Sequence, residues 1–276
     1  MKLIEKIKYR INFKLNGILK IRKSIKNYFK YSDTLFLVYS MGKTGSSSIY
    51  YTLMRDLPFN KVLHVHFLSS YWYEWFSSKA SKRNKKERNQ ILSDKAKKYI
   101  SDKGKVMTIS IIRDPFSRSI SDYFHSNKNF ISEKTDTDIK NEISNSFYIQ
   151  TNSLEWFEKD FNSYFKFDIY QKAFNKEKGW EIYDLDSKNR VLLIRIDVLT
   201  QSFKTAFLSL TGININELFI TNRREDDDML SDRYKSFKAN YGEERSSVDE
   251  KLNSKFVKHF FTDEQIEKLR AKYTAT

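Results

Sequence analysis

The stretch TLFLVYSMGKTGSSSIYYTLM, residues 34–54, sets the expectation for the fold. Its residues Leu35–Tyr39 are apolar or aromatic strand formers, which predicts a buried strand. A short loop, Gly42–Ser47, follows the strand, and the apolar spacing from Ile49 to Met54 suits a helix. The predicted order is therefore strand, loop, helix.

The loop of this stretch has the composition of an anion site. Gly42 and Gly45 are two of only seven glycines in 276 residues, and they allow backbone to approach a ligand closely. A loop that opens a helix directs free N–H groups toward one point, where the helix dipole favours negative charge. Lys43 adds a cation, and Thr44 and two serines add hydroxyl groups. The loop therefore predicts a phosphate or sulfate site.

The spacing of the glycines separates two kinds of anion loop. A nucleoside-triphosphate P-loop needs GxxxxGK followed by Ser or Thr. Gly42-Lys43-Thr44 supplies the second half, but the position of the first glycine is occupied by Leu37, inside the predicted strand. The shorter KTGSSS loop resembles instead the 5′-phosphosulfate loop of sulfotransferases that use 3′-phosphoadenosine 5′-phosphosulfate (PAPS). Taken alone, the loop also fits a glycine turn with a serine N-cap.

A second strand-to-helix junction lies about one βαβ unit further on. Val106–Ile112 is a predicted strand, and the sequence RDPFSRSISDYFH follows, with Asp114 placed as an N-cap and Pro115 at the first helical position. It resembles the 3′-phosphate motif of the same sulfotransferases, which implies that Arg113 and Ser121 bind the ribose 3′-phosphate. The SDYF sequence resembles the carbohydrate-modifying branch. An exposed ion pair on a capped helix explains the RDP triplet alone, but not two motifs in this order.

The resemblance covers residues 34–125 well, and bacterial proteins linked to capsular polysaccharide synthesis look nearest. It implies an α/β, P-loop-NTPase-like fold with a central, mostly parallel sheet flanked by helices. It also implies transfer of the sulfuryl group of PAPS to a hydroxyl of a carbohydrate, such as an acidic capsular or other surface polysaccharide, with no metal required. Lys43 would act on the bridging oxygen as electrophile or acid, and the 5′-phosphosulfate would be held by Lys43, Thr44, Gly45, Ser46 and Ser47.

The general base is predicted on a further strand, Lys61–Phe67 (KVLHVHF). His64 and His66 are two residues apart and therefore on one face of that strand. The HVHFL sequence resembles a segment of uronyl sulfotransferases, which implies that His66 is the catalytic base; an ordinary pKa of about 6.5 suits that role. His64 is interpreted as a buried residue satisfied by a neighbour, and Glu74 is the reserve base. Without cysteine or a third ligand at a recognisable spacing, a zinc site is disfavoured.

Composition narrows the class of partner. Fifty Lys plus Arg against thirty-five Asp plus Glu give a net charge of +15, which predicts an acidic partner: a nucleotide, an anionic polymer or a membrane surface. The absence of cysteine excludes disulfides and thiolate metal sites. No apolar run approaches the roughly 20 residues of a spanning helix, and charges stand where a signal peptide needs apolar residues. A cytoplasmic protein is expected.

The chain is expected to form one domain, residues 31–276, preceded by a basic amphipathic helix, residues 1–30. This N-terminal segment carries ten Lys or Arg and a single acid, Glu5. It is expected to pack on the domain with a solvated basic face, or to lie peripherally on anionic lipid at the inner face of the membrane or meet an assembly partner. Residues 79–98 are a second basic run, predicted as a solvated helix that in a sulfotransferase would line the acceptor entrance.

The remainder of the chain carries weaker signals. Residues 131–178 are predicted to be mostly helical, Arg190–Leu199 a buried strand, and Gln201–Leu210 a helix. Ser231–Tyr273 is predicted to form two or three covering helices. The family often places another basic residue for the 3′-phosphate late in the chain, and the candidates are Arg233, Lys235 and Lys238.

Two other classes of function remain open at this stage. A small-molecule kinase or nucleotide hydrolase predicts magnesium-dependent ATP binding, against which Leu37 argues. A non-catalytic basic adaptor would bind nucleic acid or membrane through residues 1–30 and 79–98, with strong salt dependence that survives loss of Lys43. The sulfotransferase interpretation expects no nucleic acid.

Overall fold

The computed structural model describes residues 31–71, 83–102, 104–146, 154–221 and 231–275. The predictions for residues 1–30 and for Glu74 lie outside these ranges. Within them, no helix has the length and apolar character needed to cross a bilayer.

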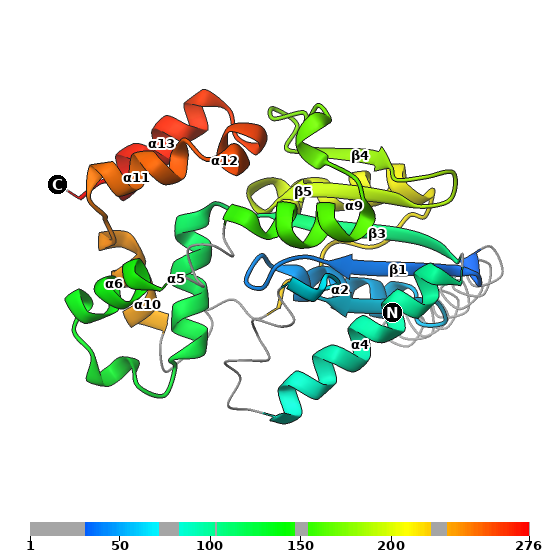
Figure 1. The fold of residues 1–276 in the computed structure, drawn as a ribbon, viewed down its shortest axis with the longest axis horizontal. Coiled ribbons are helices and arrows are strands. Elements are labelled where there is room, and N and C mark those ends of the chain that lie inside the picture. Colours follow the sequence, from blue (N-terminus) through cyan, green and yellow to red (C-terminus); the bar gives the residue numbers. More distant parts are fainter. Residues whose placement is uncertain (1–30, 72–82, 103, 147–153, 222–230, 276) are drawn as a thin grey trace, which may run out of the picture.

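A five-stranded sheet in the order β2-β1-β3-β5-β4 forms the centre of the molecule (Figure 1). β1 (Thr34–Tyr39), β2 (Lys61–Val65), β3 (Lys105–Ile112) and β5 (Arg190–Arg195) run parallel, and β4 (Trp180–Asp184) pairs antiparallel with β5 at one edge. The prediction of an α/β protein with a mostly parallel sheet is confirmed. The edge strand β4 was not predicted.

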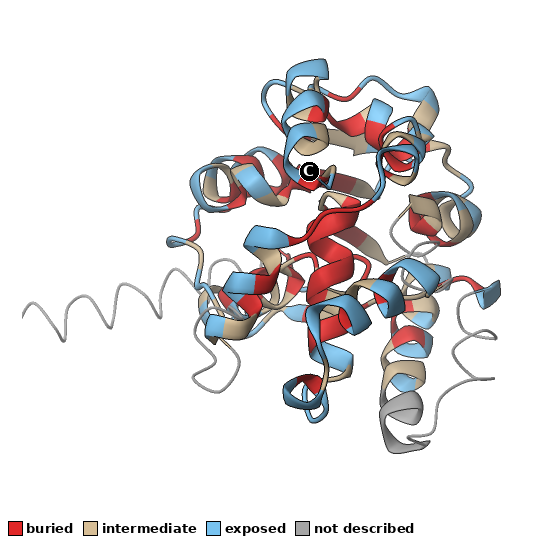
Figure 2. Cartoon of the chain, turned by 90° about the vertical axis from the view of Figure 1, so that its left-hand side faces the viewer, coloured by how far each residue is buried: buried red, intermediate tan, exposed pale blue. Residues whose placement is uncertain are grey.

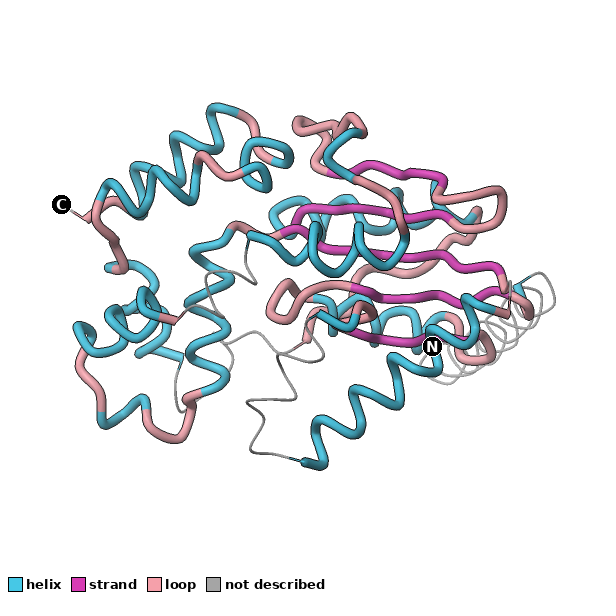
Figure 3. The backbone as a smooth tube through the Cα atoms, viewed as in Figure 1, coloured by secondary structure: helices cyan, strands magenta, loops and turns pink. Residues whose placement is uncertain are grey.

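Helices cover both faces of the sheet (Figure 3). The side chains of β1, which alternate between the two faces, show that both are buried. All six residues of β1 are buried, as expected of a parallel strand covered on two sides. Leu35 and Leu37 belong to one core layer, whereas Phe36 and Val38 belong to the other, because successive side chains point to opposite faces. The second layer is completed by α2 (Ser46–Asp56) and α9 (Ile196–Thr211), and the first by helices that include α4, α5 and the C-terminal set. These are α4 (Arg83–Ser101), α5 (Pro115–Ser126), α6 (Asp136–Asn145), α10 (Ser231–Asn240), α11 (Arg245–Leu252), α12 (Lys255–Phe260) and α13 (Asp263–Tyr273).

Several predicted boundaries differ from the structure. β2 ends at Val65, two residues earlier than predicted, and β5 ends at Arg195, so that residues 196–199 open α9 instead of extending the strand. Leu199 is buried in one core layer with Phe203, four residues later, and this helical spacing prevails over the strand propensity of the segment. The C-terminal segment forms four helices, α10–α13, rather than two or three.

The segment predicted to be mostly helical, residues 131–178, is only partly so. Besides α6, it contains short turns: the 3₁₀ segments Ile131–Glu133 and Ile169–Gln171, the π-helical segment Phe157–Asn162, and the single turn α8 (Ser163–Phe165). Aromatic residues of the π-helical segment, such as Phe157 and Phe161, are nonetheless buried in the core layer.

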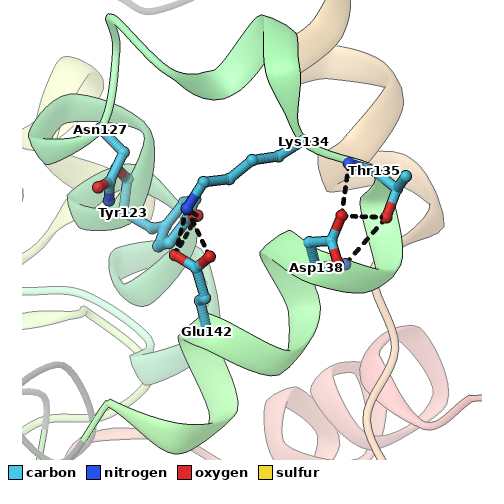
Figure 4. A network of polar contacts seen from close by, with 6 residues as sticks. All are labelled: Tyr123, Asn127, Lys134, Thr135, Asp138 and Glu142. Atoms are coloured by element: carbon cyan, nitrogen blue, oxygen red, sulfur yellow. Dashed lines mark hydrogen bonds and ion pairs between the residues drawn. The ribbon is translucent and has the colours of Figure 1, made fainter.

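α5 is buried along most of its length (Figure 2), and a polar network fixes its C-terminal half (Figure 4). The Tyr123 hydroxyl donates to the Glu142 carboxylate of α6 at 2.7 Å, and Lys134 pairs with that same carboxylate. Thr135 and Asp138 form a capping box that starts α6. The network therefore ties α5 to α6 and holds the helix that carries much of the site described next.

Candidate functional site

The two predicted anion loops lie at a topological switch point of the sheet. β1 has β2 on one side and β3 on the other, so the chain leaves β1 for β2 and then crosses to the opposite side for β3. In open α/β sheets, ligands bind outside the carboxyl ends of the strands at such a point. The loops after β1 and β3 both begin there.

The loop after β1 is built on two left-handed residues. Gly45 is the N-cap of α2 with φ 88°, and a Cβ on it would lie 3.4 Å from Ile196. Lys43 has φ 69°, a conformation that residues other than glycine seldom adopt. Such local strain costs on the order of 1 kcal/mol and is often found at ligand-binding positions. Lys43 and Gly45 are both partly exposed, so the turn is open to solvent.

The hydroxyl groups of this loop have different surroundings. Thr44 is buried, and its hydroxyl donates to the Met41 carbonyl at 3.0 Å and lies 2.8 Å from Ser40 Oγ. Its side chain therefore braces the loop from inside. Ser46 Oγ is 2.9 Å from His64 Nε2. Ser47 is partly exposed, and within the described ranges its hydroxyl makes no hydrogen bond.

Arg113 joins the two loops directly. Its Nη1 donates to the Lys43 carbonyl oxygen at 2.7 Å, and its Nε donates to Ser117 Oγ at 2.9 Å. Asp114 caps α5 as predicted, since its carboxylate accepts from the Ser117 N–H at 2.8 Å. Arg113 is partly exposed, and among the residues described its Nη2 has no hydrogen-bond partner. One guanidinium nitrogen thus remains available for a ligand.

The predicted partner of Arg113, Ser121, is one turn further along α5. Ser121 is 8% exposed, and it follows Ser117 by four residues, so both hydroxyls lie on the same side of the helix. The side chain that touches Arg113 is Ser117, which the sequence analysis missed. Its position in RDPFS, as the N3 residue of a helix capped by Asp114, was the available signal.

His66 follows the end of β2 and has a defined tautomer. Its Nδ1 lies 2.7 Å from the Ser40 carbonyl oxygen. A carbonyl can only accept, so Nδ1 carries the proton and Nε2 keeps a lone pair, the state that a general base needs. Burial lowers the pKa of His66, and the charges of Lys43 and Arg118 lower it further, against the opposing effects of the Ser40 bond and Asp122. The ring is therefore neutral near pH 7, and it is still partly exposed.

His64 fits its interpretation as a residue satisfied by neighbours. Its ring lies 4.7 Å from that of His66, which confirms that the two share a face, and its Nε2 is bonded to Ser46. Burial, with a contribution from His66, lowers the pKa of His64 to about 3. His64 is therefore a neutral side chain that contacts the ring of His66 and the first turn of α2.

Sequence reasoning also missed Arg118 and Asp122. Arg118 is completely buried; its Nε donates to the Gly42 carbonyl at 3.2 Å, and its Nη2 is 3.1 Å from the Asp122 carboxylate. The pair therefore links α5 to the loop after β1 and lies beside His66. The i, i+4 spacing was visible in the sequence, but only the packing of α5 shows that it faces this loop.

Two of the late-chain candidates for the 3′-phosphate make contacts at α6 and within α10. Arg233 bonds the Lys134 carbonyl at 2.9 Å and pairs with Asp136 at 2.7 Å, at the start of α6. Lys238 lies over the ring of Tyr234, and Lys235 is exposed.

The described residues thus bring Lys43, Gly45, Arg113 and His66 to one edge of the sheet. No group of three His, Asp or Glu side chains that could hold a metal ion is found in the part of the chain that the structure describes. Comparison of the chain with protein-family models, with curated proteins and with solved structures finds no match.

Proposed function

We propose that this protein is a sulfotransferase that moves the sulfuryl group of PAPS to a hydroxyl of a carbohydrate acceptor. The observation that carries the proposal is the 2.7 Å hydrogen bond from Arg113 Nη1 to the Lys43 carbonyl. It holds the loop after β1 and the loop after β3 side by side at the switch point. A nucleotide with anionic groups at both its 5′ and 3′ positions would be gripped by both loops at once.

The loop after β1 would bind the end of the nucleotide that reacts. The first-turn N–H groups of α2, the positive end of its dipole and the Lys43 ammonium all favour negative charge there. Arg113 would bind the 3′-phosphate with its remaining donors, because a guanidinium fork matches phosphate geometry. Ser121 is proposed on the same side of α5 as a second 3′-phosphate contact.

His66 would remove the acceptor proton. In the proposed step, the acceptor hydroxyl gives its proton to Nε2, and its oxygen forms a bond to sulfur. The bond from sulfur to the bridging oxygen of the 5′-phosphosulfate breaks, and the electron pair stays on that oxygen as adenosine 3′,5′-bisphosphate leaves. Lys43 would neutralise the charge on the leaving oxygen, where a preorganised cation contributes most.

The carbohydrate part of the proposal rests on the SDYF and HVHFL sequences and on the net charge of +15, which suits an acidic surface polysaccharide. The part of the chain that would meet the acceptor includes residues 72–82, outside the described ranges. The acceptor class is therefore proposed from sequence resemblance, and the nucleotide class from resemblance together with the geometry of the two loops.

Isothermal titration calorimetry with adenosine 3′,5′-bisphosphate and with ATP, each with and without magnesium, tests the proposal. We expect the bisphosphate to bind without magnesium and ATP to bind far more weakly. Tighter, magnesium-dependent ATP binding would instead assign the site to a kinase or hydrolase. Salt-dependent binding of nucleic acid or anionic vesicles with no nucleotide binding would assign an adaptor. Transfer of ³⁵S from labelled PAPS to desulfated polysaccharides would then identify the acceptor.

A further inference from the structure

A helix far along the chain contacts the chain at His66 and at the residues just after it. The indole Nε1 of Trp156 donates to the His66 carbonyl oxygen at 2.9 Å. Four residues later, the Asp160 carboxylate accepts from the Leu68 N–H at 2.8 Å and from Ser69 Oγ at 2.8 Å. The segment that follows β2 is therefore held by two side chains from one helix.

The same carboxylate also reaches the end of β1. The hydroxyl of Tyr39 donates to Asp160 Oδ1. Tyr39 immediately precedes Ser40, whose carbonyl accepts from His66 Nδ1. Trp156 and Asp160 thus fix the chain next to both partners of the bond that sets the His66 tautomer.

The environment of these two residues is unusual for a purely packing role. Both are completely buried, and Asp160 lies in the π-helical segment Phe157–Asn162. Burial raises the pKa of Asp160 to about 6, although its hydrogen bonds oppose the shift. A buried carboxylate is costly to keep unless donors surround it, and π-helical turns frequently occur at functional sites.

We propose that Trp156 and Asp160 form a clamp that positions His66, holding its ring so that Nε2 faces the acceptor hydroxyl. The kinetic part of this inference rests on the proposed function; the geometric part rests only on the hydrogen bonds above. Displacement of a reacting group by about 1 Å can cost on the order of a hundredfold in rate. Loss of the clamp therefore lowers kcat and leaves nucleotide binding, which uses other loops, nearly unchanged.

The hydrogen bonds around Asp160 allow a conservative variant that separates the effect of the charge from that of the hydrogen bonds. In Asp160→Asn, Oδ1 keeps the bonds from Tyr39 and Leu68, and Nδ2 donates to Ser69 Oγ. The Ser69 hydroxyl then gives its proton to the Lys159 carbonyl, which lies 3.0 Å away. This variant retains these three hydrogen bonds and removes the charge, whereas Asp160→Ala removes both.

The experiment compares Trp156→Phe, Asp160→Ala and Asp160→Asn in the full chain. Trp180→Phe is the matched control, because Trp180 is equally an indole in the core but lies on β4 in the other layer. The ¹⁵N shifts of the His66 imidazole, assigned with His66→Gln, report the Nδ1–H tautomer. Steady-state kinetics report kcat and the KM for PAPS, and calorimetry reports the affinity for adenosine 3′,5′-bisphosphate.

We expect Trp156→Phe and Asp160→Ala to reduce the Nδ1–H tautomer and to lower kcat by roughly 10–100-fold, with KM for PAPS within about threefold. Asp160→Asn should lose at least about tenfold less than Asp160→Ala, because its hydrogen bonds persist. An unchanged tautomer in Trp156→Phe overturns the clamp, as does an equal loss in Trp180→Phe. If Asp160→Ala does not fold, Trp156→Phe decides.

The failure of the clamp and the failure of the proposed function give different results. A wild-type chain that neither binds the bisphosphate nor transfers sulfate contradicts the function, and the imidazole shifts still test the clamp. A wild-type chain that transfers sulfate, with Trp156→Phe matching it in both tautomer and kcat, contradicts the clamp alone.

Discussion

Two arginines at the carboxyl ends of neighbouring strands have opposite surroundings. Arg113 follows β3, and Arg195 ends β5; the two strands pair in register, with Ile112 opposite Arg195. Each arginine also directly precedes a helix or its cap. The sequence placed Arg195 inside a longer predicted strand, and the structure shows that both arginines stand at strand-to-helix junctions.

We call the Arg195 junction closed, because groups of the protein itself occupy the guanidinium. Its side chain is 1% exposed, and all three guanidinium nitrogens are engaged. Nε and Nη2 each bond the Asp197 carboxylate at 3.0 Å, and Nη1 bonds the carbonyls of Lys176 and Phe260 and the amide oxygen of Gln265. It ties the end of β5 to the C-terminal helices.

We call the Arg113 junction open, because its side chain remains partly exposed to solvent. Its bonds go to the carbonyl of the neighbouring anion loop and to one serine, which leaves Nη2 without a partner in the described ranges. The difference teaches that a cation at a strand end can serve a ligand only where the protein leaves donors unused. Acceptors supplied by the fold make the same side chain structural.

The largest expected effect is on Lys43, in the loop after β1 whose carbonyl accepts from Arg113. We expect Lys43→Ala to lower kcat by about a thousandfold or more, because removal of a preorganised charge from a leaving oxygen typically costs that much. The measurement is the initial rate of ³⁵S transfer from labelled PAPS.

Lys166→Ala is the control for this change, since Lys166 is exposed and also has a left-handed backbone, with φ 54°. It should keep the wild-type rate. Turnover that persists in Lys43→Ala would remove the loop after β1 from the active site.

At the closed junction we expect loss of stability instead. Arg195→Ala leaves the buried Phe260 carbonyl and the partly buried Lys176 carbonyl without their donor, and a buried acceptor left unsatisfied costs about 1–3 kcal/mol. The free energy of unfolding, measured with urea, should fall by about 3 kcal/mol.

Arg190→Ala, on the same strand, is the control; its side chain is 36% exposed, and it makes a surface pair with Asp184 and one bond to the partly buried Leu210 carbonyl, so the loss should be clearly smaller, near about 1 kcal/mol. Equal losses in the two variants would show that the two junctions differ less than their hydrogen bonds indicate.

Arg113→Ala should give the reverse pattern of Arg195→Ala. Calorimetry should show the affinity for adenosine 3′,5′-bisphosphate falling by roughly 10–100-fold, because a guanidinium–phosphate contact is lost. The free energy of unfolding should change by less than about 1 kcal/mol, since the side chain is partly exposed.

Arg113→Lys sharpens this result, because it keeps the charge but not the planar fork, and we expect an intermediate affinity. Destabilisation by Arg113→Ala as large as that by Arg195→Ala, with unchanged affinity, would make Arg113 structural.

The smallest expected effect is on the pH dependence of stability, through His64, whose Nε2 is hydrogen-bonded to Ser46 in the first turn of α2. Since the pKa of His64 in the folded chain is about 3 and its ordinary value is about 6.5, the unfolded chain binds the extra proton between these values. Stability from His64 is therefore present above pH 6.5 and is lost as pH falls through this window.

His64→Gln should reduce the drop in unfolding free energy between pH 6.5 and 4.5 by about 1–2 kcal/mol. Asp160, whose raised pKa acts in the opposite direction, contributes equally to both chains and cancels in the difference. An unaltered slope in His64→Gln would show that this histidine is not held neutral.

Local sequence was sufficient for the elements that lead into the site. The strand before Lys43, the glycine turn, the Asp114 cap and the shared face of His64 and His66 all follow from patterns of fewer than ten residues, where backbone preference and capping act. The end of β5 could not be predicted in the same way. The sequence RVLLIRIDVL suits a strand or a helix, and contacts of Leu199 with a distant core layer made the choice.

The sequence by itself therefore determined that two cation-bearing strand-to-helix junctions exist and that His66 follows a strand, because local backbone preferences act between neighbouring residues. Only the tertiary structure decided that Arg113 donates a hydrogen bond to the Lys43 loop, whereas Arg195 donates to the C-terminal helices. It alone also placed Trp156 and Asp160 beside His66, some ninety residues away along the chain. Burial and hydrogen-bond supply depend on which distant segments pack together, and no short pattern records that.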